Sequence, residues 1–244
     1  MKDILDFLRL VKVNNNREWF HANKDLYLNA KEKFENIAQG ILTEIQKFDA
    51  SCRHLTLSDC VYRFYRDTRF SKDKSPYKTH FGVYVCPKGK KSLWAGYYFH
   101  IEPDEITENS EIMDDSGNKS KEVLATLTMP THSLLCAGTY MPDNPMLRSI
   151  REEIFTNGEE YIKTIKKAKG FYLCNEPALK KLPKEIPSGK YDEYIKLKAQ
   201  LLEMDIDDKF LMQKDIVKAV AKEFRKTYDF VSFINNAVSY TGNY

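Results

Sequence analysis

The chain has 244 residues, of which 42% are hydrophobic and 30% are charged, so its composition is that of a globular protein and excludes a disordered or collagen-like chain. Its 38 lysines and arginines nearly balance its 35 acidic residues, and the net charge of +3 falls short of the strongly basic balance of a dedicated nucleic-acid-binding protein. We therefore expect any anion-binding site to be local.

The cysteines and the N-terminal segment predict a cytoplasmic protein. The five cysteines are odd in number and form no Cys-x-x-Cys motif, which indicates reduced thiols. No cysteine and histidine cluster has the spacing of metal ligands, so the sequence predicts no metal and leaves the cofactors open. Asp3 and Asp6 stand where a secretion signal would be positively charged, and no apolar run approaches the roughly 20 residues that cross a bilayer, so we expect no membrane partner.

The N-terminal part of the chain predicts helices. Apolar residues from Ile4 to Val11 recur at helical spacing, and the asparagines at 14–16 can end one helix and cap the next. A second helical region is expected from Arg17 to about Phe48, with a break near Asn23.

The middle of the chain predicts antiparallel strands joined by turns. Its candidate strand segments are rich in aromatic and β-branched residues or alternate between apolar and polar ones. The acidic and polar stretch after Glu102 predicts a loop, with an insertion near 103–121. Strands are expected at 61–65, 81–86, 93–101, 123–129 and 133–140.

The C-terminal part predicts helices that pack on this sheet. A helix capped near Asp143 is expected to end at Gly158, and a second helix at 159–169 leads to a short strand at 171–174. Apolar stripes at 216–224 and 230–238 predict two more helices. The sequence therefore predicts an α+β fold, a mostly antiparallel sheet flanked by N-terminal and C-terminal helices, in a single domain over residues 1–244.

One segment, residues 63–80, carries the clearest functional signal, and we call it the arginine-rich segment. It packs six cations, two acids and four aromatic residues between two expected strands. Because a guanidinium group can bind a carboxylate or phosphate through two parallel hydrogen bonds, three arginines here predict an anion site. The predicted ligand-binding residues are Arg63, Arg66, Arg69, Lys72 and Lys78.

The same segment supplies candidate catalytic residues, if a reaction occurs there. Asp67 or His80 would move a proton, and Tyr77 would orient the substrate. Whether the protein is an enzyme stays open at this point.

Three functions are compatible with the arginine-rich segment. It can bind a small phosphorylated or carboxylated ligand, or it can bind nucleic acid, with bases stacked on Tyr65 or Tyr77. It can also be structural in a non-catalytic interaction protein, because Arg66 with Asp67 and Lys72 with Asp73 can form ion pairs on a solvated loop. We favour the small anionic ligand; protein partners remain unknown.

Three weaker groups of residues complete the candidates. His80 and His100 can meet across neighbouring strands, as an acid–base pair or as hydrogen-bonded core residues. A histidine can also pair with the thiol of Cys86 or Cys136, although unpaired cysteines are usually small buried hydrophobic residues. Carboxylates that can gather for a metal or for acid–base work are Glu102, Asp104, Asp67 and Asp73.

Several blocks of the sequence resemble the DUF2461 family. The longest block is Arg63 to Thr79, which follows Asn15-Asn16-Arg17-Glu18-Trp19-Phe20, and the similarity extends over nearly the whole chain. The resemblance implies a single domain of this family and implies no activity. The chain is longer than the family pattern between Glu102 and Leu134. The later blocks of similarity lie at 96–103, 137–142 and 147–151.

Overall fold

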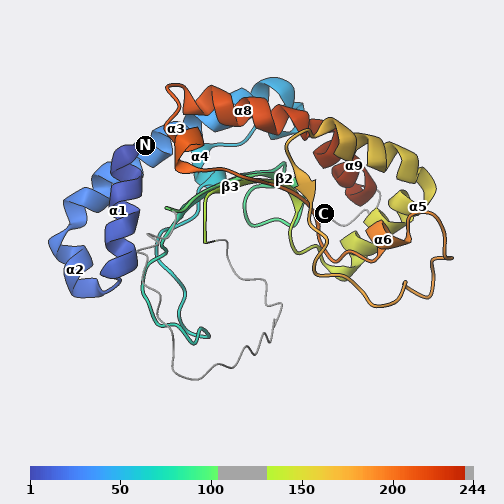
Figure 1. Cartoon of the computed structure of the whole chain (residues 1–244), viewed down its shortest axis with the longest axis horizontal. Coiled ribbons are helices and arrows are strands. Elements are labelled where there is room, and N and C mark those ends of the chain that lie inside the picture. The colour runs from blue at the N-terminus through green and yellow to red at the C-terminus, as the bar shows by residue number, and fades with distance from the viewer. Residues whose placement is uncertain (104–130, 240–244) are drawn as a thin grey trace, which may run out of the picture.

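The computed structural model describes residues 1–103 and 131–239 (Figure 1). The strand expected at 123–129 and nearly all of the insertion expected near 103–121 lie outside these residues. None of the described helices is long and apolar enough to cross a membrane. The helices are α1 (Lys2–Val13), α2 (Arg17–Ala22), α3 (Lys24–Phe48), α4 (Leu57–Cys60), α5 (Asn144–Lys167), α6 (Asp192–Ile195), α7 (Asp208–Leu211), α8 (Ile216–Lys226) and α9 (Tyr228–Ser239), with a 3-10 turn, η1, at Ala50–Cys52.

The strands form one antiparallel sheet in the order β1-β2-β3-β5-β4, which confirms the α+β fold class. Three of them lie where the sequence predicted strands, and the short β4 lies within the expected 171–174. The strands are β1 (Phe81–Val85), β2 (Gly96–Ile101), β3 (Leu134–Thr139), β4 (Tyr172–Leu173) and β5 (Gln200–Asp205).

The N-terminal helices begin and end where the sequence predicted. The side chain of Asn16 accepts a hydrogen bond of 2.9 Å from the backbone N–H of Trp19, so it caps α2. Asn23 separates α2 from α3, which then runs without interruption to Phe48. The helices expected at 216–224 and 230–238 are also present, as α8 and α9.

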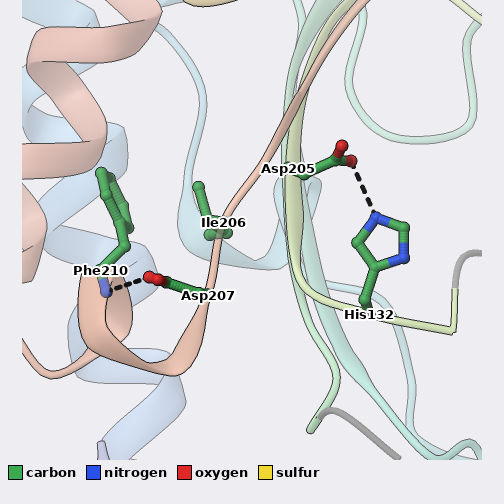
Figure 2. Close-up of a pocket in the computed structure, with 5 residues that line it drawn as sticks. All are labelled: His132, Asp205, Ile206, Asp207 and Phe210. Carbon is green, nitrogen blue, oxygen red and sulfur yellow. Dashed lines mark hydrogen bonds and ion pairs between the residues drawn. The ribbon is translucent and has the colours of Figure 1, made fainter.

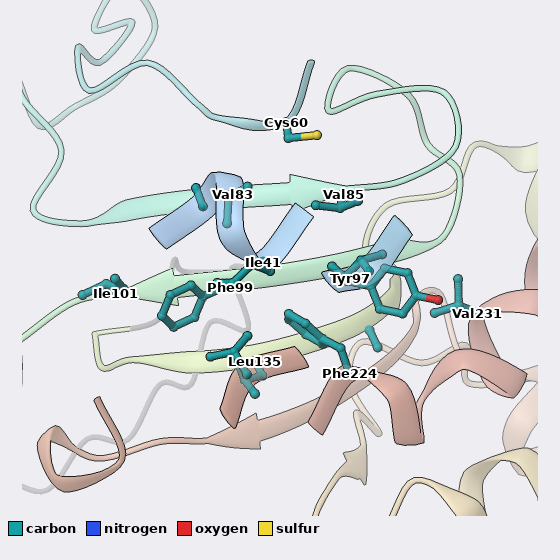
Figure 3. Packing of buried hydrophobic residues seen from close by; sticks show 14 of the residues in the cluster. Ile41, Cys60, Val83, Val85, Tyr97, Phe99, Ile101, Leu135, Phe224 and Val231 are labelled. Carbon is teal, nitrogen blue, oxygen red and sulfur yellow. The ribbon is translucent and has the colours of Figure 1, made fainter. Parts of the chain in front are cut away.

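The helices cover one face of the sheet. Figure 1 shows α3 and α8 above the strands and extended chain beneath them. Successive side chains of a strand point to opposite faces, and on β2 it is Tyr97, Phe99 and Ile101 that point into the layer beneath the helices (Figure 3). The ring of Tyr97 lies 5.5 Å from that of Phe224 on α8, with both side chains fully buried. The other face of β2, which carries Tyr98 and His100, is free to hold polar groups.

Two sequence predictions about strands were wrong. Residues 61–65 form no strand but two isolated bridges, Val61 to Val83 and Tyr65 to Tyr77, because the chain leaves β1 after the first bridge and pairs with its own return segment. β5 was not predicted at all. Its Gln-Leu-Leu-Glu-Met residues have low intrinsic strand preference, and its pairing with β3 along six residues overrides that preference.

The helical geometry is interrupted next to Gly158, where the sequence predicted one helix to end and another to begin, but α5 spans the interruption. α5 continues to Lys167 across a kink at Asn157, where φ is −119° and ψ is 33°. A Cβ atom on Gly158 would lie 2.4 Å from the ring of Tyr191. The glycine therefore serves close packing between α5 and the segment before α6.

Asn235 fastens α9 to the start of β2. Its side-chain oxygen accepts a 2.9 Å hydrogen bond from the N–H of Ala95, and its amide donates a 3.0 Å bond to the carbonyl of the same residue. Both residues are buried. The two bonds fix the chain immediately before Gly96, where the sheet begins.

We predict that N235A lowers the free energy of unfolding by about 1–3 kcal/mol, because it leaves the two polar groups of Ala95 buried without partners. N236A, which changes the exposed neighbouring asparagine, is the matched control and should stay within about 0.5 kcal/mol of wild type. Urea denaturation measures both; equal stabilities for the two variants would contradict the assignment.

Candidate functional site

The face of the sheet opposite the helices, which we call the open face, gathers the chemically useful side chains. Tyr98 of β2 lies between Tyr84 of β1 and Cys136 of β3 in the strand register. His100 follows Tyr98 on the same face, two residues along the strand. Period-two alternation thus separates these residues from the apolar core.

A pocket of about 490 Å³ opens on this face. Its size is within the range of small-molecule sites, and most of the surface that lines it is apolar. The residues that line it are Tyr62, Lys78, His80, Tyr84, Lys90, Lys91, Ser92, Leu93, Gly96, Tyr98, Cys136, Gly138, Thr139, Tyr140, Met141, Leu201 and Glu203.

The charged lining of the pocket is divided between its two sides. Lys78, Lys90 and Lys91 come from the segments that flank β1, whereas Glu203 comes from β5, three strands away in the sheet order. The ammonium group of Lys78 lies 5.2 Å from the centre of the Tyr62 ring. Burial, and secondly the Arg63 guanidinium, lower the pKa of Lys78. An anion beside Lys78 would therefore meet a partly desolvated positive charge.

A buried polar cluster adjoins the pocket at the ends of β1 and β2. His100 Nε2 lies 3.2 Å from Glu102 Oε2, and His80 Nδ1 lies 3.8 Å from the same oxygen. The two imidazole rings are 4.4 Å apart, which confirms that these histidines meet across neighbouring strands. The exposed fractions of the three side chains are 8% or less. His80 belongs both to the cluster and to the pocket wall.

Further hydrogen bonds hold each member of the cluster in place. The other oxygen of Glu102, Oε1, accepts a 2.7 Å bond from Thr79 and lies 3.3 Å from the ammonium of Lys12 on α1. His100 Nδ1 lies 2.9 Å from the hydroxyl of Tyr98. A neutral His100 satisfies both contacts when Nε2–H donates to Glu102 and Nδ1 accepts from Tyr98.

Gly82 makes room for the Tyr98 hydroxyl. A Cβ atom at this position would lie 2.7 Å from that oxygen, closer than side-chain carbons approach. The glycine therefore allows the phenol of Tyr98 to lie across β1 and reach His100, its partner along β2.

Burial decides the charge state of the cluster. It lowers the pKa of His80 to about 3, with smaller effects in the same direction from His100 and Lys78. Burial also lowers the pKa of His100, although the hydrogen bond to Glu102 opposes it. For Glu102, burial acts to raise the pKa, but hydrogen bonds from His100 and Thr79 outweigh it and leave the pKa below its usual value. Near pH 7 the cluster therefore holds two neutral imidazoles and one carboxylate.

The structure places the arginine-rich segment on a two-stranded ribbon beside the open face. The N–H of Arg66 donates to Pro76 and the N–H of Lys78 donates to Phe64, each at 3.0 Å. The guanidinium of Arg66 pairs with Asp73 and also contacts Ser71 Oγ at 3.3 Å.

Arg69, the next arginine of the segment, is paired as well. Its Nε and Nη2 donate to Asp67 at 3.0 and 2.7 Å. The segment therefore contains ion pairs, as expected if its role is structural. The partners differ from those expected, because Arg66 pairs with Asp73 and Asp67 pairs with Arg69. Whether this segment binds an anion stays a prediction.

The remaining predicted site residues are spread over different environments. Lys78 and His80 line the pocket together, whereas Arg63 and Lys72 are exposed. Tyr77 is 3% exposed, and its ring stacks on that of Phe20 at 3.8 Å, so it packs against the N-terminal helices.

The carboxylates considered in the sequence do not form one group. Asp67 and Asp73 pair with arginines of their own segment, and the hydrogen bond from Arg69 lowers the pKa of Asp67 to about 2. Glu102 instead contacts Lys12, Thr79 and His100. Asp104 lies outside the described residues.

The cysteine candidates are unsuited to nucleophilic chemistry. Burial raises the pKa of the Cys86 thiol, which contacts Ser92 Oγ at 3.2 Å. Burial, with a smaller effect of Glu203, also raises the pKa of Cys136. Neither thiol is held as a thiolate beside a histidine.

Sequence reasoning missed four functional-looking residues: Tyr98 as the partner of His100, Lys90 and Lys91 at the pocket rim, and Glu203 on β5. The alternation Tyr98–His100–Glu102 was the available signal, because it places three polar side chains on one face of a strand. Glu203 had no signal, since its strand was not predicted.

A second cavity, of about 510 Å³, lies between the end of β5 and α7 (Figure 2). Its polar side chains already have partners: His132 Nε2 lies 2.8 Å from Asp205, and Asp207 accepts a 2.7 Å hydrogen bond from the N–H of Phe210 at the start of α7. These polar groups of the cavity are therefore already engaged within the protein, and we take the pocket on the open face as the candidate site.

Residues 3–108 and 114–233 match the model of a protein family described as "Conserved hypothetical protein (DUF2461)". This match confirms the resemblance seen in the sequence and includes all the residues of the pocket and the polar cluster. A search of curated proteins and a search of solved structures each found no match.

We predict that the protein loses stability as the pH falls below about 6.5, the ordinary value for histidine. The folded state keeps His80 neutral down to about pH 3, whereas the unfolded chain takes up a proton, so unfolding is favoured in acid. Urea denaturation at several pH values between 7.5 and 5 measures the slope.

H80Q should make that slope shallower by at most about 1.4 kcal/mol per pH unit, the contribution of one proton. H54Q removes an exposed imidazole and should keep the wild-type profile. Identical slopes for wild type and H80Q would show that His80 is not held neutral by the fold.

Proposed function

This chain belongs to the DUF2461 family, and because the description of that family names no activity, we propose from the pocket itself that the protein binds a small carboxylated or phosphorylated molecule on the open face of its sheet. The observation that carries the proposal is the half-buried Lys78, whose ammonium faces a largely apolar pocket of about 490 Å³.

The position of Lys78 favours an anion over a neutral ligand. A partly desolvated ammonium group gains more from a negative partner than a solvated one, because the local dielectric is lower and less hydration remains to be displaced. Lys90 and Lys91 add positive charge at the same rim. The Lys78 ammonium lies over the face of the Tyr62 ring, and an aromatic ring holds a cation without neutralising it.

The rest of the lining favours an organic ligand with a second polar group. Tyr62, Tyr98 and Leu201 offer apolar surface to the body of the molecule. Glu203, on the opposite side from the lysines, accepts hydrogen bonds. The ligand that fits carries its anionic group toward Lys78 and a hydroxyl or amino group toward Glu203.

The arginines of the arginine-rich segment, together with the exposed Lys72, are the alternative residues for binding the anion. If Arg63, Arg66 and Arg69 hold the anion, Asp67 and Asp73 must first be displaced from two of them. Nucleic acid on the same ribbon is the other alternative, and it requires affinity that falls steeply with salt.

The cysteines support the proposed cytoplasmic location. All five thiols are free, and four of them are buried. Free thiols fit a reducing compartment.

The first test is a thermal-shift screen at two salt concentrations. Its probes are inorganic phosphate, nucleoside monophosphates, sugar phosphates, hydroxy- and amino-carboxylates, and short oligonucleotides. A ligand present at a hundred times its dissociation constant adds about 2.7 kcal/mol and raises the melting temperature by a few degrees. Stabilisation by oligonucleotides alone, lost in salt, would replace the proposal with nucleic-acid binding.

For the best small anion of that screen, we predict that K78M raises the dissociation constant roughly ten- to hundredfold. Loss of one charged hydrogen bond costs about 1.5–3 kcal/mol, while the methionine keeps an unbranched apolar side chain at this position. Isothermal titration calorimetry measures the change, and the melting temperature of the free variant checks its fold.

Two variants distinguish the pocket from the arginine-rich segment. K72M removes an exposed lysine of that segment and should bind as wild type does. The R66A/R69A double variant should also keep its affinity. Lost binding in R66A/R69A together with normal binding in K78M would place the anion on the ribbon instead of in the pocket.

A further inference from the structure

His80, His100 and Glu102 offer three metal-ligand atoms at one point of the fold. Each provides a nitrogen or a carboxylate oxygen, and the three atoms all lie within 4.8 Å of one another. Among the residues that the structure describes, this is the one group of three or more such side chains with that spacing. Two imidazoles and a carboxylate are a ligand set that zinc and other divalent transition metals accept.

The geometry leaves a single carboxylate oxygen facing both imidazoles. Glu102 Oε2 lies 3.2 Å from His100 Nε2 and 3.8 Å from His80 Nδ1. Donor atoms bound to one zinc ion at 2.0–2.2 Å in a tetrahedral arrangement are about 3.3–3.6 Å apart. The two distances from Oε2 are therefore close to those around a zinc ion, and the two nitrogens, which lie within 4.8 Å of each other, would have to approach to complete the set.

Outer hydrogen bonds of the kind that orient metal ligands are present on two of the three residues. Glu102 Oε1 is held by Thr79 at 2.7 Å and by Lys12 at 3.3 Å, which turns Oε2 toward the histidines. His100 Nδ1 is held by the Tyr98 hydroxyl at 2.9 Å. When its proton sits on Nδ1 and is donated to Tyr98, the Nε2 lone pair is free for a metal.

We propose that His80, His100 and Glu102 form a three-ligand site for a divalent transition metal of the zinc class, beside the pocket on the open face. Three protein ligands leave a fourth position open, as in metal sites that bind water or substrate. His80 also lines the pocket, so a ligand there would lie next to the ion. The site uses residues other than Lys78 and stands whether or not the pocket binds an anion.

Nearby positive charge sets the expected strength of binding. The ammonium of Lys12 lies 3.3 Å from Glu102, and Lys78 lies close enough to affect both histidines. These charges oppose a dication, so we expect weaker binding than in a structural zinc site with four ligands. The ion should still bind at this cluster.

The test is titration of the full chain, first dialysed against a chelator, with Co²⁺ and Zn²⁺. Wild type should bind one Co²⁺ per chain, with visible d–d absorption bands of a protein-bound ion, and Zn²⁺ should displace it. Calorimetry with Zn²⁺ gives the same stoichiometry independently. Absence of saturable binding by both metals would overturn the proposal.

Variants locate the ion. H80Q and E102Q keep much of the side-chain volume and should each weaken Co²⁺ binding at least tenfold. H54Q, which removes an exposed histidine, is the control and should bind as wild type does. Unchanged binding in both H80Q and E102Q would show that the ion sits elsewhere.

A further variant tests the outer contacts without removing a ligand. Y98F removes the hydroxyl beside His100 and should weaken Co²⁺ binding roughly tenfold or more while leaving one ion per chain. Circular dichroism and thermal melting in chelator show whether each variant is folded. If E102Q fails to fold, H80Q at the edge of the cluster decides the question.

Discussion

The buried carboxylate of Glu102 is the constraint on which the open face depends. A charge that is 6% exposed is costly unless it is paired and hydrogen-bonded. Glu102 meets this requirement by drawing together Lys12 of α1, Thr79 at the end of the arginine-rich segment, and His100 of β2. Its backbone N–H also donates to Ser133 beside β3. One residue, through its side chain and its backbone, thus ties α1, the arginine-rich segment, β2 and the start of β3 to a single point.

One face of the sheet packs against the hydrophobic core, and the other carries the residues of the candidate site. Beneath the helices, rings such as Tyr97 and Phe99 fill a continuous core, and α9 is fastened to the sheet by Asn235. The opposite face carries the pocket and the polar cluster on residues that alternate with the core ones. The blocks of sequence that resemble the family meet here, since 96–103 and 137–142 pair through Gly96 with Gly138 and Tyr97 with Ala137, and the block at 63–79 leads directly into His80.

The elements that the sequence predicted correctly are those with strong local signals. The asparagines around α2 and the apolar stripe of α3 define the N-terminal helices without tertiary information. The sequence did not predict β5, because its residues prefer a helix and form a strand only through their pairing with β3. At the site, cationic residues could be read from the sequence, but their partners could not: Arg66 turns to Asp73, while Lys78 turns into the pocket. Glu203 could be assigned to the pocket only once the fold was known.

The most direct test of whether the polar cluster on the open face is a metal-binding site is anomalous diffraction at the zinc edge, from crystals of the full chain soaked in zinc chloride. The strongest peak should lie between His80, His100 and Glu102, at about 2.0–2.2 Å from one donor atom of each. Peaks confined to exposed side chains such as His54, with the buried cluster unchanged, would show that its hydrogen bonds serve only to hold the sheet together.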